Sequence, residues 1–525
     1  MNSLAPWDAT MYWLSARTRN DLFLLYCFAD TGVPTAELRA AIAERTARIP
    51  DLLVRVLDVP ANLAYPRWVS CEFADGQIVE YALEESDWSE LLNALGKLVD
   101  TSLDPTDRPW RLHLFRHVTA APTASGPALV AVLQLSHALA DGRRAADLAR
   151  ALFTERDGTA PIPLPRNGNS VGAQRGNDAV RPEGSERLSK RSDDRRHGGA
   201  AGPTPCGTTD QRGSGSPTER RAAVFPDRVR RWFAAAVALP GIPLGMARTV
   251  FRGYTAYRAQ RELAELTARG RLPPPASGYP PNLLHGNGAI PGHAVRMLVF
   301  DTADLRTPGH TVTVVALTAV SLAVQRYLRA RGEPADALGA QVPMAVSGDS
   351  GDQRNSYRDL SVDLAADEPD PHRRADRIAA TMATRRTRAT HPLHAAQDAV
   401  TAALPAPVLH RDVTTYPMDV LPDRISGHTV VSSVHRGPAD LTLGSGPVHF
   451  TAGFPALGSV MHLTHGIHGL GDTVTFSIHA DPAVIPDLDT YAQLLTTAVA
   501  DVVTALRCAP GKAEGPGNAE GPRPE

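Results

Sequence analysis

Apolar residues recur along the chain in two alternating patterns, one typical of buried strands and one typical of amphipathic helices. Residues 128–137 (ALVAVLQLSH) form a nearly continuous apolar run, which predicts a buried strand. Directly after it, Ala145, Leu148, Ala149 and Leu152 follow helical spacing and predict a helix with one apolar face. Strand and helix signals alternate in both halves of the chain, and this alternation indicates α/β layers.

Other segments show the same two periodicities. Thr35 is expected to cap a helix that carries Leu38, Ile42 and Ile49 on one side. The C-terminal half predicts three helices and a strand, namely helices over 314–331 (stopped by Gly332), 372–388 and 486–507, and a strand over 474–480.

Composition and charge narrow the class of protein. A chain of 525 residues with 43% hydrophobic residues favours roughly two domains. With 54 Lys and Arg against 56 Asp and Glu, there is no basic excess, so nucleic acid is not expected as a partner. The four cysteines form no C-x-x-C pair, and the N-terminus lacks a secretory signal pattern, which together predict a cytoplasmic protein.

Breaks in composition divide the chain into five segments. Residues 166–222 contain very few apolar side chains and cannot bury enough surface to offset the entropy of ordering. We therefore predict an N-terminal domain (1–155), a disordered insertion (156–222), a helical connector (223–280), a C-terminal domain (281–508) and a disordered tail (509–525).

The connector contains an uncharged stretch between Arg231 and Arg248 that allows two interpretations. Pro240 and Pro243 interrupt it, and its length falls short of a bilayer core of about 30 Å. No transmembrane helix is predicted. The stretch either lies in a membrane interface, with the flanking arginines near phosphates, or forms a pair of short packed helices.

The residues that carry candidate chemistry stand where the strand at 128–137 gives way to the helix. His137 is expected at the rim of the sheet, where an imidazole with a near-neutral pKa is suited to take a proton from an alcohol. Asp141 is expected to orient the ring or to pair with an arginine, and Gly142 allows close approach of the backbone. His462, His465 and His468 lack a carboxylate pattern, so no metal site is predicted.

Several blocks resemble, in the same order, those of the bacterial wax ester synthase/diacylglycerol acyltransferase family, a branch of the CoA-dependent acyltransferase superfamily. The segment from Ser136 to Gly142 resembles the H-H-x-x-x-D-G site, with Ser136 in place of the first histidine. LAPWDATMYWL, SLDPTDRPWRLHLF, VPMAVSGDSGDQRNSYRDLSVDL (with Asn355 at the family's Asn), VVSSVHRGP and HGLGDTVTFSIHADPAVIPD resemble further family blocks. Thr313 and Val314 replace the family's Asn-Asp pair.

The resemblance implies two chloramphenicol acetyltransferase-like domains, each a mixed sheet flanked by helices, facing one another across a tunnel with His137 near its middle. It implies an O-acyltransferase that moves a long-chain acyl group from acyl-CoA to a long-chain alcohol or diacylglycerol, with acyl-CoA as substrate and no cofactor. His137 is the implied general base, Asp141 is structural, and Ser136, Thr313, Ser432 or Ser433 is the implied oxyanion or substrate contact.

The insoluble acceptor makes peripheral binding at the inner face of the membrane or at lipid droplets the expected location. Two alternatives stay open. The first is a related acyltransferase that uses a carrier-protein thioester or a polyketide alcohol. The second is a non-catalytic lipid-binding homologue, suggested by the replacements at Ser136 and Thr313.

Overall fold

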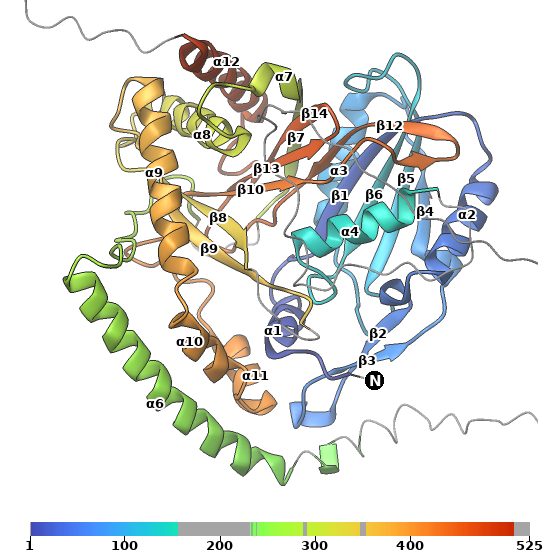
Figure 1. Ribbon diagram of the computed structural model, residues 1–525. Helices are drawn as coiled ribbons and strands as arrows, with labels where there is room; N and C mark the ends of the chain where they lie inside the picture. The colour runs from blue at the N-terminus through green and yellow to red at the C-terminus, as the bar shows by residue number, and fades with distance from the viewer. Residues whose placement is uncertain are drawn as a thin grey trace, which may run out of the picture. The chain divides into compact units, whose positions relative to one another are not determined.

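Two mixed six-stranded sheets, one built mostly from each half of the chain, form the framework of the protein (Figure 1). The computed structural model describes residues 2–155, 232, 235–237, 239–286, 291–346 and 353–508. The predicted disordered insertion over 156–222 and the predicted tail over 509–525 lie outside the described residues. The described residues all belong to one compact unit. The predicted mixed α/β class with two sheets and flanking helices is confirmed.

The N-terminal sheet has the strand order β11-β12-β1-β6-β5-β4, and its neighbours are antiparallel except for the parallel pair β4 and β5. Strands β2 and β3 form a separate two-stranded sheet. The N-terminal half contributes α1 (Pro6–Leu14), β1 (Leu22–Ala29), α2 (Thr35–Ala47), β2 (Val54–Leu57), β3 (Arg67–Ser70), β4 (Ile78–Tyr81), α3 (Trp88–Val99), β5 (Trp110–Val118), β6 (Ala128–Leu135) and α4 (Gly142–Phe153). Short 3-10 turns occur at Pro50–Leu52, Pro60–Asn62 and Asp75–Gln77.

Strand β6 lies in the middle of this sheet and is buried along its whole length. Because side chains alternate between the two faces of a strand, Leu129, Ala131 and Leu133 join a core that includes residues of α2 and α4. Val130 and Val132 join a second core that includes residues of α3. Burial on both faces explains why β6 reads as a continuous apolar run, and the predicted strand and the helix after it are confirmed.

The C-terminal sheet has the order β7-β14-β13-β10-β8-β9, in which β13, β10 and β8 are parallel and the other neighbours are antiparallel. The elements of this half are α6 (Gly241–Ala268), β7 (Ala294–Asp301), α7 (Thr302–Leu305), α8 (Val312–Arg329), β8 (Gly339–Ala345), β9 (Tyr357–Asp363), α9 (Pro371–Ala389), α10 (His394–Thr401), α11 (Ala406–Thr415), β10 (Thr429–His435), β11 (Thr442–Leu443), β12 (Gly446–Gly453), β13 (Leu463–Leu470), β14 (Thr473–Ala480) and α12 (Leu488–Arg507). The predicted helices correspond to α8, α9 and α12, and the predicted strand to β14.

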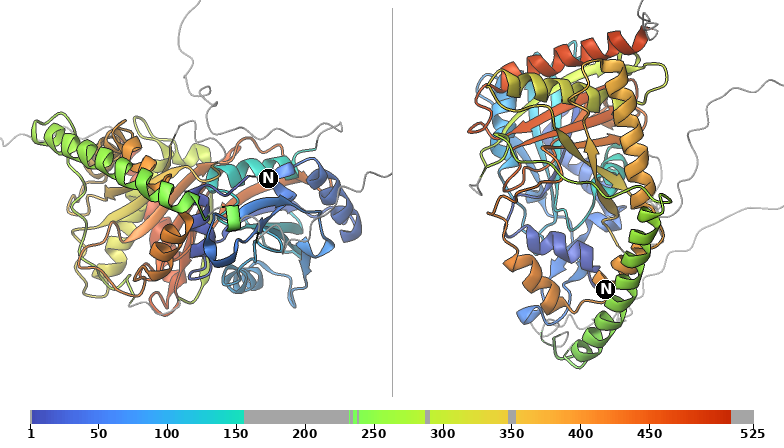
Figure 2. Two further views of the ribbon diagram at one scale, coloured as in Figure 1. Left: turned by 90° about the horizontal axis from the view of Figure 1, so that it is seen from below. Right: turned by 90° about the vertical axis from the view of Figure 1, so that its left-hand side faces the viewer.

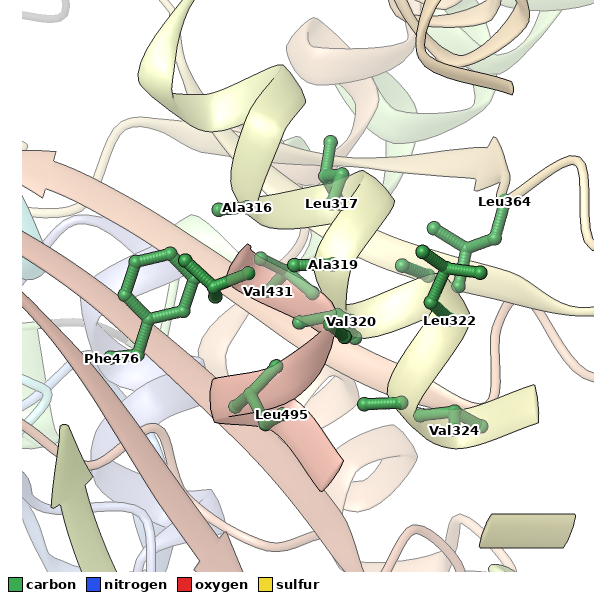
Figure 3. Packing of buried hydrophobic residues seen from close by; sticks show 14 of the residues in the cluster. Ala316, Leu317, Ala319, Val320, Leu322, Val324, Leu364, Val431, Phe476 and Leu495 are labelled. Carbon is green, nitrogen blue, oxygen red and sulfur yellow. The ribbon is translucent and has the colours of Figure 1, made fainter. Parts of the chain in front are cut away.

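Helix α8 forms the centre of the C-terminal core. Figure 3 shows Val320 of α8 close to Val431 of β10 and Leu495 of α12, all members of one buried cluster. Within the described part of the chain, α8 is the helix long and apolar enough to cross a membrane, but 78% of it is buried inside the protein. Its apolar composition is explained by packing between the sheet and α12.

The β11–β12 segment comes from the C-terminal half of the sequence but extends the N-terminal sheet. Strand β12 pairs with β1 in an antiparallel register from Leu24 opposite Gly453 to Phe28 opposite Val448. A Cβ atom on Gly466 of β13 would lie 2.4 Å from the Gly453 carbonyl oxygen, so only glycine allows this close approach of β13 to β12. The C-terminal half of the sequence therefore contributes two strands to the N-terminal sheet.

The structure corrects two local predictions. Helix α2 begins at Thr35, but Pro34 is the N-cap residue and no side chain caps the helix; Ile49 lies beyond its C-terminal end. The interpretation of residues 231–248 as a pair of short helices is corrected in length only: residues 232 and 235–237 are helical and residues 239–240 form a turn, but the second helix is long. Helix α6 begins at Gly241 and continues past this stretch, and Pro243 is tolerated because its missing N–H falls in the first turn.

Candidate active site

The turn between β6 and α4 presents the predicted base. His137 follows the end of β6 and is half-buried, while the three residues after it are buried. The turn is held by two backbone hydrogen bonds, from Ser136 N–H to the Pro109 carbonyl (2.8 Å) and from Leu139 N–H to the Ser136 carbonyl (2.8 Å). The ring is therefore carried by a rigid strand end and keeps some contact with solvent.

Asn355, which precedes β9, holds the His137 ring from the other half of the chain. Its Nδ2 donates to the His137 carbonyl oxygen (2.8 Å) and to Asp8 Oδ1 (2.9 Å), both of which can only accept. These two acceptors determine the orientation of the amide, so Oδ1 is the atom that faces His137 Nδ1 at 2.9 Å. Because a carbonyl oxygen cannot donate, Nδ1 carries the hydrogen, and Nε2 is left with its lone pair.

Asp8 of α1 anchors Asn355 in turn. Its carboxylate is fully buried, and Oδ1 accepts the backbone N–H of Asn355 (2.9 Å) in addition to the side-chain amide. Oδ2 accepts the backbone N–H of Arg354 at 3.0 Å. Burial raises the pKa of Asp8 to about 6, against the lowering effect of these hydrogen bonds. Asp8, Asn355 and His137 thus form a chain of contacts that joins α1, the segment before β9 and the β6–α4 turn.

Asp141 connects the same elements by a second route. Its Oδ1 caps α4 by accepting the backbone N–H of Arg144 (2.9 Å), and its Oδ2 accepts the backbone N–H of Ser356 (3.0 Å). Asp51 adds ion pairs to Arg144 (3.0 Å) and Arg354 (2.8 Å). Asp141 therefore positions the turn and the Asn355 segment, which agrees with the structural role that the family resemblance implies.

Burial lowers the pKa of the His137 imidazole below its usual range, while the Asn355 hydrogen bond and the Asp141 charge act in the opposite direction. The sign of this shift favours the neutral ring. At neutral pH the imidazole is therefore uncharged, and the Nε2 lone pair is available to accept a proton.

The other predicted hydroxyls lie at different depths. The Ser136 hydroxyl is fully buried and lies 3.4 Å from the backbone N–H of Ala138, inside its own turn. Ser433 of β10 lies on the same strand face as the core residue Val431, and its hydroxyl contacts that of Thr313 in the first turn of α8 at 2.9 Å.

Ser432 lies on the opposite face of β10, together with Val434. A Cβ atom placed on Gly142, the first residue of α4, would lie 3.9 Å from Val434 Cγ2. The face of β10 that carries Ser432 is therefore the one that approaches the turn of the predicted base. Among the predicted hydroxyls, Ser432 shares this face and Ser433 does not.

Two residues that contact the site had not been predicted to take part in it. Asp8 and Asn355 are 347 positions apart in the chain and meet only in the fold. The sequence did contain a signal, because both residues fall in blocks that resemble the acyltransferase family. The blocks alone do not reveal that the two side chains bind one another.

The histidines of the 462–468 segment have separate partners. His462 Nδ1 lies 2.7 Å from Asp481 Oδ2, and His465 contacts Thr429 Oγ1 (2.9 Å) and Tyr491 Oη (2.8 Å). Across the described residues, no group of three or more His, Cys, Asp or Glu is arranged to hold a metal ion. These side chains instead belong to the buried framework of the C-terminal half.

Buried neutral histidines make the fold sensitive to acid. Burial lowers the pKa of His113 and His428 to about 4 and that of His465 and His479 to about 3. In the unfolded state each of these four histidines takes up a proton below about pH 6.5. The unfolded state then binds more protons than the folded state, so the free energy of unfolding falls as the pH falls, by about 1.4 kcal/mol per pH unit for each group.

Two buried carboxyl groups offset part of this loss. Burial raises the pKa of Asp8 and Asp21 to about 6, so the folded state binds protons at these groups between pH 6 and pH 4. For these six groups the net loss is about 3 kcal/mol per pH unit. Urea unfolding at pH 7, 6 and 5 measures this dependence of the free energy of unfolding on pH. His428→Gln should reduce the slope by about 1.4 kcal/mol per pH unit, and a stability that stays flat from pH 7 to pH 5 would contradict the prediction.

A cavity of ≈ 510 Å³ lies away from these residues, between α3 and β7. Its polar lining includes Lys97, Asp100, His293 and Arg296. None of its lining residues belongs to the predicted site, and the candidate chemistry therefore does not depend on this cavity.

The fold is that of the CoA-dependent acyltransferases with two mixed-sheet halves. The solved wax ester synthase/diacylglycerol acyltransferase from Marinobacter aquaeolei VT8 is similar over 96% of this chain and 100% of its own, with 17% identity and a TM-score of 0.57. A mutant starter condensation domain of rhizomide synthetase RzmA, solved with C8-CoA and Leu-SNAC, is similar over 97% of this chain and 94% of its own, with 11% identity and a TM-score of 0.51. No curated protein matches the chain.

Two family models cover most of the described chain. The wax ester synthase/diacylglycerol acyltransferase catalytic domain matches residues 4–195, and the WS/DGAT C-terminal domain matches residues 355–502. The chain belongs to the wax ester synthase/diacylglycerol acyltransferase family and is an acyltransferase. The predicted family and the predicted enzyme class are confirmed.

Proposed function

We propose that this acyltransferase moves a long-chain acyl group from acyl-CoA to the hydroxyl of a long-chain alcohol or a diacylglycerol, with His137 as general base. Family membership supports acyl transfer from CoA in general. The acceptor class is proposed from the family, and the observation that carries the proposed base is the hydrogen bond from His137 Nδ1 to Asn355 Oδ1. That bond leaves Nε2 unprotonated on a half-buried ring, which is the form that a general base requires.

The proposed reaction needs no acyl-enzyme. His137 Nε2 takes the proton of the acceptor hydroxyl, and the alcohol oxygen forms a bond to the thioester carbonyl carbon. The tetrahedral intermediate then breaks its carbon–sulfur bond, and the imidazolium returns the proton to the departing CoA thiolate. The products are an ester and free CoA, and neither a metal nor a further cofactor takes part in these steps.

The negative charge on the carbonyl oxygen requires a hydrogen-bond donor in the proposed mechanism. Ser432 is the favoured candidate, because it lies on the face of β10 that approaches α4. The paired hydroxyls of Thr313 and Ser433 are the second candidate, since only one of the two protons is used in their mutual hydrogen bond. We further propose that the enzyme acts on the cytoplasmic side, with substrates entering a tunnel between the two halves.

An acceptor panel tests the proposal. The purified protein is incubated with acyl-CoA and with hexadecanol, a diacylglycerol or no acceptor, and the free CoA thiol and the ester product are both measured. We expect thiol release that depends on the acceptor and equals the amount of ester formed. Thiol release without ester would indicate hydrolysis instead.

Two outcomes would contradict the proposal. If the protein is inactive with acyl-CoA but active with the same acyl group on a carrier protein, the alternative acyltransferase is correct. If the protein binds acyl-CoA or the acceptor but no ester forms with any donor, the non-catalytic lipid-binding alternative is correct.

A further inference from the structure

Helix α6 presents large apolar side chains to solvent along its outer face. Val250, Phe251, Tyr254 and Tyr257 are 72%, 73%, 62% and 58% exposed. Leu244 and Met246, one to two turns earlier, are also exposed. An exposed group of this size on one element marks an interaction surface, because soluble proteins usually bury such side chains.

The opposite face of α6 is already occupied. Thr249 Oγ1 donates to the Ala403 carbonyl (3.0 Å), and Arg252 Nη1 donates to the Ala399 carbonyl (2.9 Å) at the end of α10. Figure 2 shows α6 along the outside of the protein in both views. The apolar side chains point away from these contacts, since Val250, Tyr254 and Tyr257 follow i, i+4, i+7 spacing on the outer side.

Along α6 as far as Arg261 the charged residues are all arginines, and the first carboxylates, Glu262 and Glu265, come in its last two turns. From Trp232 to Arg261 the chain contains no aspartate or glutamate. Arg248, Arg258 and Arg261 are exposed, and they flank the apolar residues along the helix. A stretch of aromatic and aliphatic side chains that is bordered by arginines and ends before the first carboxylate is complementary to the acyl region and the anionic headgroups of a phospholipid surface.

We propose that the outer face of α6 docks the protein on an anionic phospholipid surface. In this arrangement Phe251, Val250 and Leu244 enter the acyl boundary, and Tyr254 and Tyr257 occupy the headgroup level. Arg248 and Arg258 pair with phosphates while their alkyl stems cover apolar surface. Trp232, Val237 and Leu239 are likewise exposed just before the helix. This inference concerns where the protein binds and does not depend on the proposed acyl transfer.

Vesicle sedimentation tests the proposal in the absence of any acyl-CoA or acceptor. The full-length protein is mixed with phosphatidylcholine vesicles that contain or lack phosphatidylglycerol, at low and at high salt. We expect binding to the anionic vesicles that weakens with salt. The double variant Val250→Ser/Phe251→Ser should reduce the partition coefficient at least about tenfold, because both side chains would otherwise be buried in lipid.

Matched variants separate the apolar from the electrostatic contribution to vesicle binding. Arg258→Gln/Arg261→Gln should bring binding to anionic vesicles close to the level of neutral vesicles. Val420→Ser, which alters a valine that is 61% exposed before β10 instead of one on α6, should leave binding unchanged. All four positions changed in the α6 variants are exposed, so thermal unfolding of these variants should match that of the wild type.

Three results would overturn the proposal. One is equal vesicle binding by the wild type and the Val250→Ser/Phe251→Ser variant. Another is no binding of the wild type to any vesicle. The third is self-association of the wild type in light scattering that the same variant abolishes, which would assign the α6 face to contact between two copies of the chain.

Discussion

Replacing His137 with alanine is expected to lower kcat/KM for acyl transfer by about 10²- to 10⁴-fold, the contribution typical of a positioned general base. The imidazole is the only side chain in the described contacts of this turn whose free nitrogen can take a proton from an alcohol at neutral pH. The change in kcat/KM is determined by measuring ester formation at saturating acyl-CoA as a function of acceptor concentration.

The adjacent serine provides the control for this prediction. Ser136→Ala removes a buried hydroxyl with one long contact in its own turn, and we expect activity within about threefold of the wild type. The unfolding free energy of His137→Ala should fall by only about 1 kcal/mol, because one hydrogen bond to Asn355 is lost. Equal activity of the wild type and a folded His137→Ala protein would remove His137 from the mechanism.

Replacing Asp8 with alanine is expected to lower the free energy of unfolding by about 3–5 kcal/mol and to reduce kcat. The carboxylate accepts three hydrogen bonds, from the backbone N–H groups of Arg354 and Asn355 and from the Asn355 side chain. Without it these buried donors lose their acceptor, and each such loss costs about 1–3 kcal/mol. Urea unfolding and steady-state kinetics measure the two effects.

Asp8 is a positioning residue, because it acts on His137 through Asn355. Asp8→Asn keeps one oxygen for the Asn355 amide and should therefore recover part of the stability lost in Asp8→Ala. We expect Asp8→Asn to lower kcat more than it changes KM. The substitution disturbs the orientation of the His137 ring and does not disturb the binding of acyl-CoA. Asp51→Ala removes a mostly buried carboxylate that pairs with Arg144 and Arg354, so it should also lower the free energy of unfolding, but it should leave kcat near the wild-type value because Asp8 still holds Asn355. If Asp8→Asn and Asp51→Ala had the same kcat, the role assigned to Asp8 would be wrong.

Local periodicity was sufficient to predict the elements that pack within one half. Apolar spacing predicts strand β6 and helices α4, α8, α9 and α12. Each of these elements buries one or both faces, and residues close together in the sequence determine which positions are apolar. The start of α2 was predicted correctly but its cap was not, since Pro34 precedes Thr35 and no side chain contributes. The break at Pro240 is present, but α6 is long and not short, because Pro243 falls in its first turn and does not end the helix.

Contacts between distant segments could not be predicted in this way. Strand β12 leaves its own half to pair with β1, and no local pattern of residues 446–453 specifies a partner more than 400 positions away. The same holds for the hydroxyl candidates. Which face of β10 approaches α4 depends on the packing of the two halves, so the sequence could not separate Ser432 from Ser433.

The sequence by itself determined the α/β class, the family and the position of His137 at the end of a buried strand, because these depend on local pattern and on blocks read in order. Only the tertiary structure decided which tautomer the ring adopts. That choice requires Asp8 and Asn355, from opposite halves of the chain, to converge on one turn, and hydrogen-bond direction has meaning only when the atoms are within about 3 Å of one another.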